Sequence, residues 1–146
     1  MTVARLVGIN HVALEVGDLD AALALYRRLF DFELRGRSGS MAFIDIGDQF
    51  LALAEGRSQP RDDGRHFGLV VDDKEAVRAA IEAEGLEQVG IGHRLDFLDP
   101  WGNRIEIVGY RDIQFERVEP VKRKLGIQGL EKTEKARAEI ADRGLA

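Results

Sequence analysis

The sequence contains no cysteine, only three histidines and one tryptophan, and no long uncharged apolar run. The absence of cysteine excludes disulfides, thiolate nucleophiles and cysteine-ligated metal sites. The longest uncharged helix-like run, Ala21 to Tyr26, is far too short to cross a bilayer, and no secretory apolar segment stands at the N-terminus. We therefore expect no membrane association and a cytoplasmic location.

The chain also lacks an excess of basic charge. Its 21 Lys and Arg residues stand against 26 Asp and Glu, for a formal net charge of -5. A nucleic-acid-binding domain normally carries a basic face, so the balance argues against nucleic acid as a partner. A length of 146 residues, 45% of them hydrophobic, leaves room for one domain or for two small units that share a core.

One segment recurs after 55 residues. The stretch HVALEVGDLDAALA, from His11 to Ala24, matches HFGLVVDDKEAVRA, from His66 to Ala79. The identical pairs are His11 and His66, Leu14 and Leu69, Val16 and Val71, Asp18 and Asp73, Ala21 and Ala76, and Ala24 and Ala79. Repetition at a fixed offset indicates a duplicated structural unit.

Both copies predict the same order of elements. Alternating apolar residues predict a strand, an Asp predicts a helix N-cap, and turn residues separate the strands that follow. We expect strands at 9–16, near 32–34, at 42–46 and 50–53, then at 66–71, near 86–90, at 94–98 and 103–109, with helices after Asp18 and at about 73–84, and a linker at 56–65. The predicted fold is therefore α+β, with two βαβββ units at about 7–55 and 65–110.

These two units make up an expected domain at 1–110, and residues 111–146 form an extension. Leu130 to Arg143 is predicted to be helical, although Ala136 and Ile140 give it only a thin apolar stripe. Such a helix would cover the domain or a partner subunit, or would act as a lid over a cavity.

Two of the three histidines, His11 and His66, occupy equivalent repeat positions, opposite the Val and Leu stripe that covers the helix. If the units face each other, the two imidazoles approach near the pseudo-symmetry axis. Glu106 is a lone carboxylate amid apolar residues on an expected central strand, where unpaired burial would be costly. A metal bound by all three side chains would satisfy them and leave open coordination positions. The alternative is a pair of hydrogen-bonded packing histidines and a solvated glutamate.

Three further residues are candidates for contacts with a substrate. Leu95 and Phe97 are expected to face the helices, which leaves Arg94 and Asp96 on the Glu106 side of the sheet. Arg94 would suit an anionic group on a substrate, or the two charged side chains form a mutual salt bridge. Glu15 shares the His11 face and is a candidate base or partner of a ligand.

The twofold βαβββ pattern, the opening NHVALEV and the closing LDPWGNRIEIV resemble the vicinal oxygen chelate superfamily over about residues 7–110. This superfamily includes glyoxalase, bleomycin-binding proteins and extradiol dioxygenases. The resemblance implies a glyoxalase-like open barrel of mixed sheet and a homodimer. It also implies a divalent ion (Fe, Mn, Ni or Zn) on His11, His66 and Glu106. The repeat offset assigns the fourth ligand position to Leu51, which cannot bind a metal.

The resemblance implies a metal-dependent lyase, thiol transferase or dioxygenase that chelates a small oxygenated substrate, with antibiotic resistance among the expected roles. The chain departs from the fosfomycin transferases, which have a threonine where this sequence has Ala13 and a longer loop where it has Val89 to Gly92. One alternative is a metal-free protein that sequesters a bleomycin-like drug. Another is an interaction module that uses the charged tail.

Overall fold

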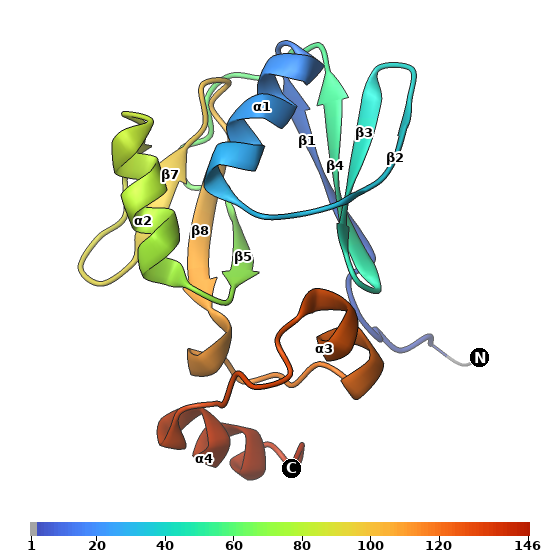
Figure 1. The fold of residues 1–146 in the computed structure, drawn as a ribbon, viewed down its shortest axis with the longest axis vertical. Coiled ribbons are helices and arrows are strands. Elements are labelled where there is room, and N and C mark those ends of the chain that lie inside the picture. The colour runs from blue at the N-terminus through green and yellow to red at the C-terminus, as the bar shows by residue number, and fades with distance from the viewer. Residues whose placement is uncertain (1–2) are drawn as a thin grey trace.

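The fold repeats one arrangement of a helix and four strands (Figure 1), and the computed structural model describes residues 3–146. The first unit comprises β1 (His11–Val16), α1 (Leu19–Leu29), β2 (Leu34–Ser38), β3 (Met41–Ile46) and β4 (Gln49–Glu55). The second comprises β5 (Phe67–Val71), α2 (Lys74–Ala83), β6 (Glu87–Gln88), β7 (Leu95–Leu98) and β8 (Arg104–Gly109). The predicted α+β class and the duplication are confirmed.

Each unit folds into its own four-stranded mixed sheet. The strand orders are β1-β4-β3-β2 and β5-β8-β7-β6, and the first strand of each unit runs parallel to its last. The two sheets stand on opposite sides of α1 and do not close into a barrel, as the open glyoxalase-like fold requires (Figure 1). β1 and β5 are therefore both edge strands.

The same capping residue begins the helix of each unit. The Asp18 carboxylate accepts a hydrogen bond from the backbone amide of Ala21, and that of Asp73 accepts one from Ala76. Satisfying an otherwise unpaired amide at a helix N-terminus stabilises the helix by about 1 kcal/mol. The repeat thus extends from the sequence to the local geometry.

One hydrophobic core joins the two units. It contains the inner side chains of both sheets together with the apolar faces of α1 and α2. Tyr26 of α1 is fully buried, and its hydroxyl donates a 2.9 Å hydrogen bond to Asp99 of the second unit. The units therefore share both apolar packing and a buried polar contact.

The strand register corrects one expectation. Ala13 pairs with Ala52 in the first unit, and Gly68 pairs with Glu106 in the second. Ala52, and not Leu51, is consequently the structural equivalent of Glu106, while Leu51 lies in the core. An alanine cannot bind a metal either, so the first unit still offers no fourth ligand at this position.

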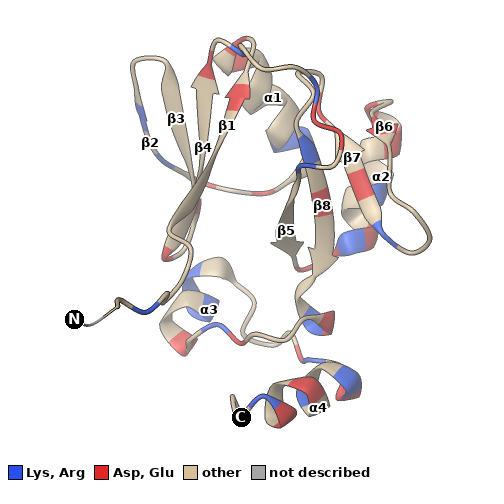
Figure 2. Cartoon of the chain, turned by 180° about the vertical axis from the view of Figure 1, so that it is seen from behind, with Lys and Arg blue, Asp and Glu red and all other residues tan. Residues whose placement is uncertain are grey.

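The extension after β8 contains more structure than the sequence predicts. It consists of η1 (Tyr110–Asp112), α3 (Glu119–Leu125) and α4 (Glu134–Asp142). The sequence does not predict α3, and α4 starts after Thr133, whose hydroxyl caps it, rather than at Leu130. Figure 2 shows acidic and basic residues along α4, whose buried residues are Ala136 and Ile140.

Candidate metal centre

Three potential metal ligands converge on one face of the second sheet. His66 directly precedes β5, and Asp96 of β7 pairs with Glu106 of β8 across the strand ladder. One ligand atom from each of these residues lies within 4.8 Å of the other two. Within residues 3–146, they form the one group of three or more His, Asp or Glu side chains with such geometry.

The His66 ring is oriented so that Nε2 faces the carboxylates. Nδ1 lies 2.8 Å from the carbonyl oxygen of Gly64, and a carbonyl can only accept, so Nδ1 carries the proton of this bond. In the neutral ring, Nε2 then keeps its lone pair, and it lies 3.7 Å from Oε1 of Glu106. A backbone partner that fixes the tautomer in this way is usual for metal-binding histidines.

Two arginines neutralise the buried carboxylate of the cluster. Asp96 is fully buried, and burying an unpaired carboxylate would be prohibitively costly. Arg94 donates to both of its oxygens, at 3.1 and 2.7 Å, and Arg104 donates to Oδ2 at 3.0 Å. The hydrogen bond to Asp96 is the main cause of a raised pKa for Arg94. The neighbouring acidic bands of β7 and β8 are visible in Figure 2.

Arg94 lies on the Glu106 side of the sheet, as the alternation predicts, while Leu95 and Phe97 are buried in the core. It makes the salt bridge with Asp96 and a second one with Glu106, at 2.8 Å. Arg104 was not singled out from the sequence. Its position two residues before Glu106 on the same strand would have placed it on this face.

His11 lies on the other sheet and is not part of this cluster. Its ring stacks on Phe50 with centroids 4.6 Å apart, and the side chain is exposed. Nδ1 lies 2.7 Å from the Oδ1 atom of Asn10, and an amide oxygen can only accept, so Nδ1 carries the proton of this bond. In the neutral ring, Nε2 then keeps its lone pair, as in His66. Within one chain, the structure brings together His66 and Glu106 but not His11.

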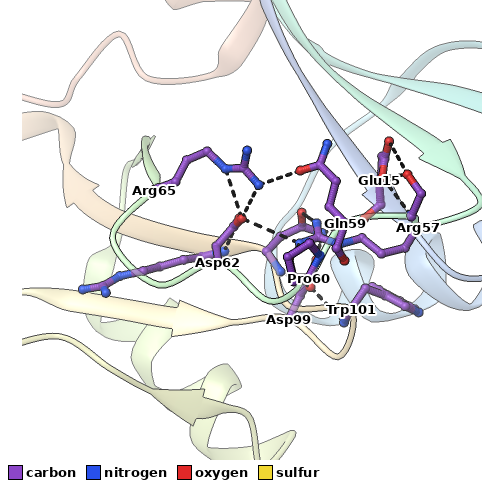
Figure 3. A network of polar contacts seen from close by, with 11 residues as sticks. Glu15, Arg57, Gln59, Pro60, Asp62, Arg65, Asp99 and Trp101 are labelled. Carbon is purple, nitrogen blue, oxygen red and sulfur yellow. Dashed lines mark hydrogen bonds and ion pairs between the residues drawn. The ribbon is translucent and has the colours of Figure 1, made fainter.

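Glu15 anchors the linker between the two units. Its carboxylate accepts hydrogen bonds from the backbone amide and the hydroxyl of Ser58, and the amide bond is the main cause of its lowered pKa. Figure 3 shows Glu15 in the same network of polar contacts as Arg57, Asp62 and Arg65. The structure thus gives Glu15 a linker contact rather than a contact with the His66 cluster.

A separate cavity of about 730 Å³ lies between the two units. Its lining is mainly apolar and includes His11, but not His66, Asp96 or Glu106. Leu125 and Ile127 of the extension line it as well. Lys124 of α3 forms a 3.1 Å salt bridge to Asp45 of the first sheet, so the extension links β8 to the hairpin of the other unit.

Within residues 3–146, no helix combines the length and the apolar character that a membrane span requires.

Comparisons with known proteins agree with the fold. Metallothiol transferase FosB of Lysinibacillus sphaericus (strain C3-41) is 34% identical over 55 residues, which make up 38% of this chain and 39% of that protein. The match therefore covers about two fifths of the length of this relative.

Solved structures with low sequence identity share the fold. Fosfomycin resistance protein FosX from Listeria monocytogenes, complexed with Mn(II) and 1S,2S-dihydroxypropylphosphonic acid, matches with a TM-score of 0.61 and 23% identity, over 70% of this chain and 90% of that chain. FosX from Mesorhizobium loti matches with a TM-score of 0.60 and 20% identity, over 70% of this chain and 91% of that chain.

A family model covers both units. The model described as Glyoxalase/Bleomycin resistance protein/Dioxygenase superfamily matches residues 8–107, which include β1 to β7 and most of β8. With this match over more than half of its length, the chain belongs to the Glyoxalase/Bleomycin resistance protein/Dioxygenase superfamily.

Proposed function

We propose that this protein is a divalent-metal-dependent enzyme that acts on a small oxygenated substrate with an anionic group. The observation that carries the proposal is the convergence of Nε2 of His66 and the carboxylate of Glu106 on the face of the second sheet opposite the hydrophobic core. Imidazole and carboxylate together suit Mn, Fe, Ni or Zn. The ligands in the proposal are His66 and Glu106 of one chain and His11 of a second copy.

Two edge strands support a homodimer as the active form. β1, with His11, and β5, next to His66, are edge strands that do not pair with each other. On the outer edge of β1 the Glu15 carbonyl accepts a hydrogen bond from Asn103, and the remaining edge is open to a strand of a second copy. The segment before β1 also carries exposed apolar side chains, namely Val3, Leu6, Val7 and Ile9. Pairing β1 of one chain with β5 of another would cover both edges and bring His11 to the His66 cluster.

The chain's own residues have distinct roles in the proposed reaction. Gly64 and Asn10 fix the rings of His66 and His11 with Nε2 as the ligand atom. Arg94, whose side chain is 44% exposed, is the candidate contact for an anionic substrate group. A divalent ion at this position would polarise a substrate oxygen and stabilise an oxyanion or enolate. The reaction class is lyase, thiol transferase or dioxygenase.

The relatives indicate which substrates to assay first. FosB is a metallothiol transferase, and the FosX structures are fosfomycin resistance proteins, so fosfomycin with a thiol or with water is the first pair of reactions to assay. Catechols and 2-oxo acids follow as substrates of other reaction types. This sequence has Ala13 where the fosfomycin transferases have a threonine. Other oxygenated anions should therefore be assayed as alternative substrates.

Metal analysis of the purified protein tests the proposal. We expect a stoichiometric divalent ion in the wild type and none in the His11→Ala, Glu106→Ala double variant. A matched control is Glu87→Ala, because Glu87 pairs with Arg61 outside the cluster. Wild-type protein that stays metal-free after incubation with each of the four ions would contradict the proposal.

The cavity favours a second candidate function, sequestration of a small apolar molecule without catalysis. Its volume of about 730 Å³ is within the usual range for small-molecule sites. Glu106 does not line the cavity, so ligand binding that is unchanged in the single variant Glu106→Ala would support sequestration over the enzyme.

A further inference from the structure

One nitrogen of Arg94 lies at the centre of the proposed metal site. Its Nη2 atom is 2.7 Å from Oδ2 of Asp96, 2.8 Å from Oε1 of Glu106 and 3.2 Å from Nε2 of His66. These three residues are the group with metal-ligating geometry. The guanidinium therefore contacts each of the potential ligand atoms at once.

We propose that Arg94 is a tethered cation that competes with the divalent metal for the same position. The inference rests on the proposed function, since it assumes that a metal binds to His66 and Glu106. A transition metal binds such nitrogen and oxygen atoms at about 2.0–2.2 Å and carries two positive charges. It cannot occupy this space together with a guanidinium nitrogen, so loading the metal requires Arg94 to swing out.

The neighbouring contacts allow this movement. When Arg94 leaves, the buried Asp96 keeps its ion pair with Arg104, at 3.0 Å. Glu106 has ion-pair partners only in Arg94 and His66 among the described residues, so its carboxylate becomes available to the metal. Arg94 itself is 44% exposed and directly precedes β7, so its side chain can turn into solvent without opening the core.

The exchange also changes the charge of the site. With Arg94 in place, two guanidiniums balance the carboxylates of Asp96 and Glu106. With a divalent ion in its place and Arg94 turned outward, the site carries excess positive charge and an arginine available to an incoming anion. Metal loading would therefore prepare the site for an anionic substrate. Arg94 first occupies the position of the metal and, once displaced, contacts the substrate.

Mn²⁺ titration of the full chain, with free Mn²⁺ measured by electron paramagnetic resonance, tests the inference. We expect Arg94→Gln to bind Mn²⁺ about tenfold more tightly or better, because the metal no longer displaces charge-assisted hydrogen bonds. Arg65→Gln is the charge-matched control, since Arg65 adjoins His66 but pairs with Asp62. It should change the affinity by less than about twofold, as expected for a screened exposed charge.

Several outcomes would overturn the inference. Equal affinities of the wild type and Arg94→Gln would show that Arg94 does not compete, and equal tightening in Arg65→Gln would show a net-charge effect alone. If the wild type and Arg94→Gln both fail to bind any divalent ion, the proposed function itself fails.

A measurement on the wild type does not depend on how a variant folds. The Nε–H group of Arg94 donates to Oδ1 of Asp96 at 3.1 Å. Saturation with diamagnetic Zn²⁺ should shift its ¹⁵N NMR signal to the position of a solvent-exposed arginine. A signal that stays in place while Zn²⁺ binds would overturn the inference.

Discussion

Asp96 and Glu106 lie directly opposite each other on β7 and β8, and the same Arg94 guanidinium donates hydrogen bonds to Asp96 and forms a 2.8 Å ion pair with Glu106. Two carboxylates side by side repel each other unless cations stand between them. Their surroundings differ, because Asp96 is fully buried and has a second arginine, whereas the Glu106 side chain is 22% exposed. This difference assigns a structural role to Asp96 and supports Glu106 as the proposed metal ligand.

Asp96→Asn should destabilise the fold. The substitution leaves two arginines without their shared carboxylate, and breaking a buried ion pair from one side costs about 3 kcal/mol. Urea denaturation measures the change in the free energy of unfolding. Glu87→Gln, which breaks only an exposed pair with Arg61, should have a much smaller effect. Equal losses in the two variants would contradict the structural role of Asp96.

Tyr26→Phe should weaken the fold and remove part of its sensitivity to alkali. The buried hydroxyl bonds to Asp99, which keeps its bonds from Asn103, so we expect a loss of about 1 kcal/mol at neutral pH. Burial, together with the charge of Asp99, raises the pKa of Tyr26 well above its usual value.

The raised pKa fixes the sign of the pH effect. An unfolded tyrosine ionises near pH 10, so the contribution of a neutral Tyr26 is complete below that pH. It is lost as the pH rises above 10 toward the higher pKa of the folded state. Denaturation at pH 8 to 11 should show a steeper alkaline decline for the wild type than for Tyr26→Phe, and parallel curves would contradict the assignment.

Lys132→Met should loosen the C-terminal extension without affecting metal binding. The Lys132 side chain is buried and donates hydrogen bonds to the carbonyl oxygens of Tyr110 and Ile113, while its ammonium lies 3.6 Å from the centroid of the Tyr110 ring. Their loss should cost about 1–2 kcal/mol and speed proteolysis of residues 131–146. Exposed Lys135 provides the control variant Lys135→Met. Unchanged cleavage in Lys132→Met would show that other contacts hold the extension.

Glu15→Gln distinguishes a linker contact from a catalytic base. The amide oxygen can still accept from Ser58, so the fold and the metal content should persist. Because the Glu15 pKa is lowered in the folded state, its contribution to stability is present above its ordinary pKa of about 4.3 and is lost as the pH falls. In Glu15→Gln, the free energy of unfolding should lack this decrease at acid pH. A variant that keeps its metal but loses turnover would instead identify Glu15 as a base.

The repeat was the most informative feature of the sequence. The offset between Asp18 and Asp73 predicted two caps, two helices and two sheets, because local signals recur wherever a duplicated unit folds in the same way. It misplaced the equivalent of Glu106 by one residue. The second unit is two residues shorter between β5 and β7 and one residue longer in the hairpin between β7 and β8, so Glu106 follows Ala52 by 54 residues rather than 55.

The elements that sequence patterns missed depend on distant contacts. α3 is short and highly charged. Its position depends on the salt bridge between Lys124 and Asp45 and on the packing of Val121 against Gly47. The alternation of β7 predicted on which face Arg94 would lie. It could not predict that the guanidinium would also contact Glu106 and His66, since that depends on how β5 and β7 flank β8.

The central claim is a metal site built from His66 and Glu106 of one chain and His11 of another. Mixing the His11→Ala and Glu106→Ala variants, unfolding them together and refolding them tests it most directly, with metal content as the readout. In a mixed dimer, one site carries both substitutions and the other carries none. The account predicts that the refolded mixture binds metal although neither variant does alone, and a mixture as metal-free as its components would contradict it.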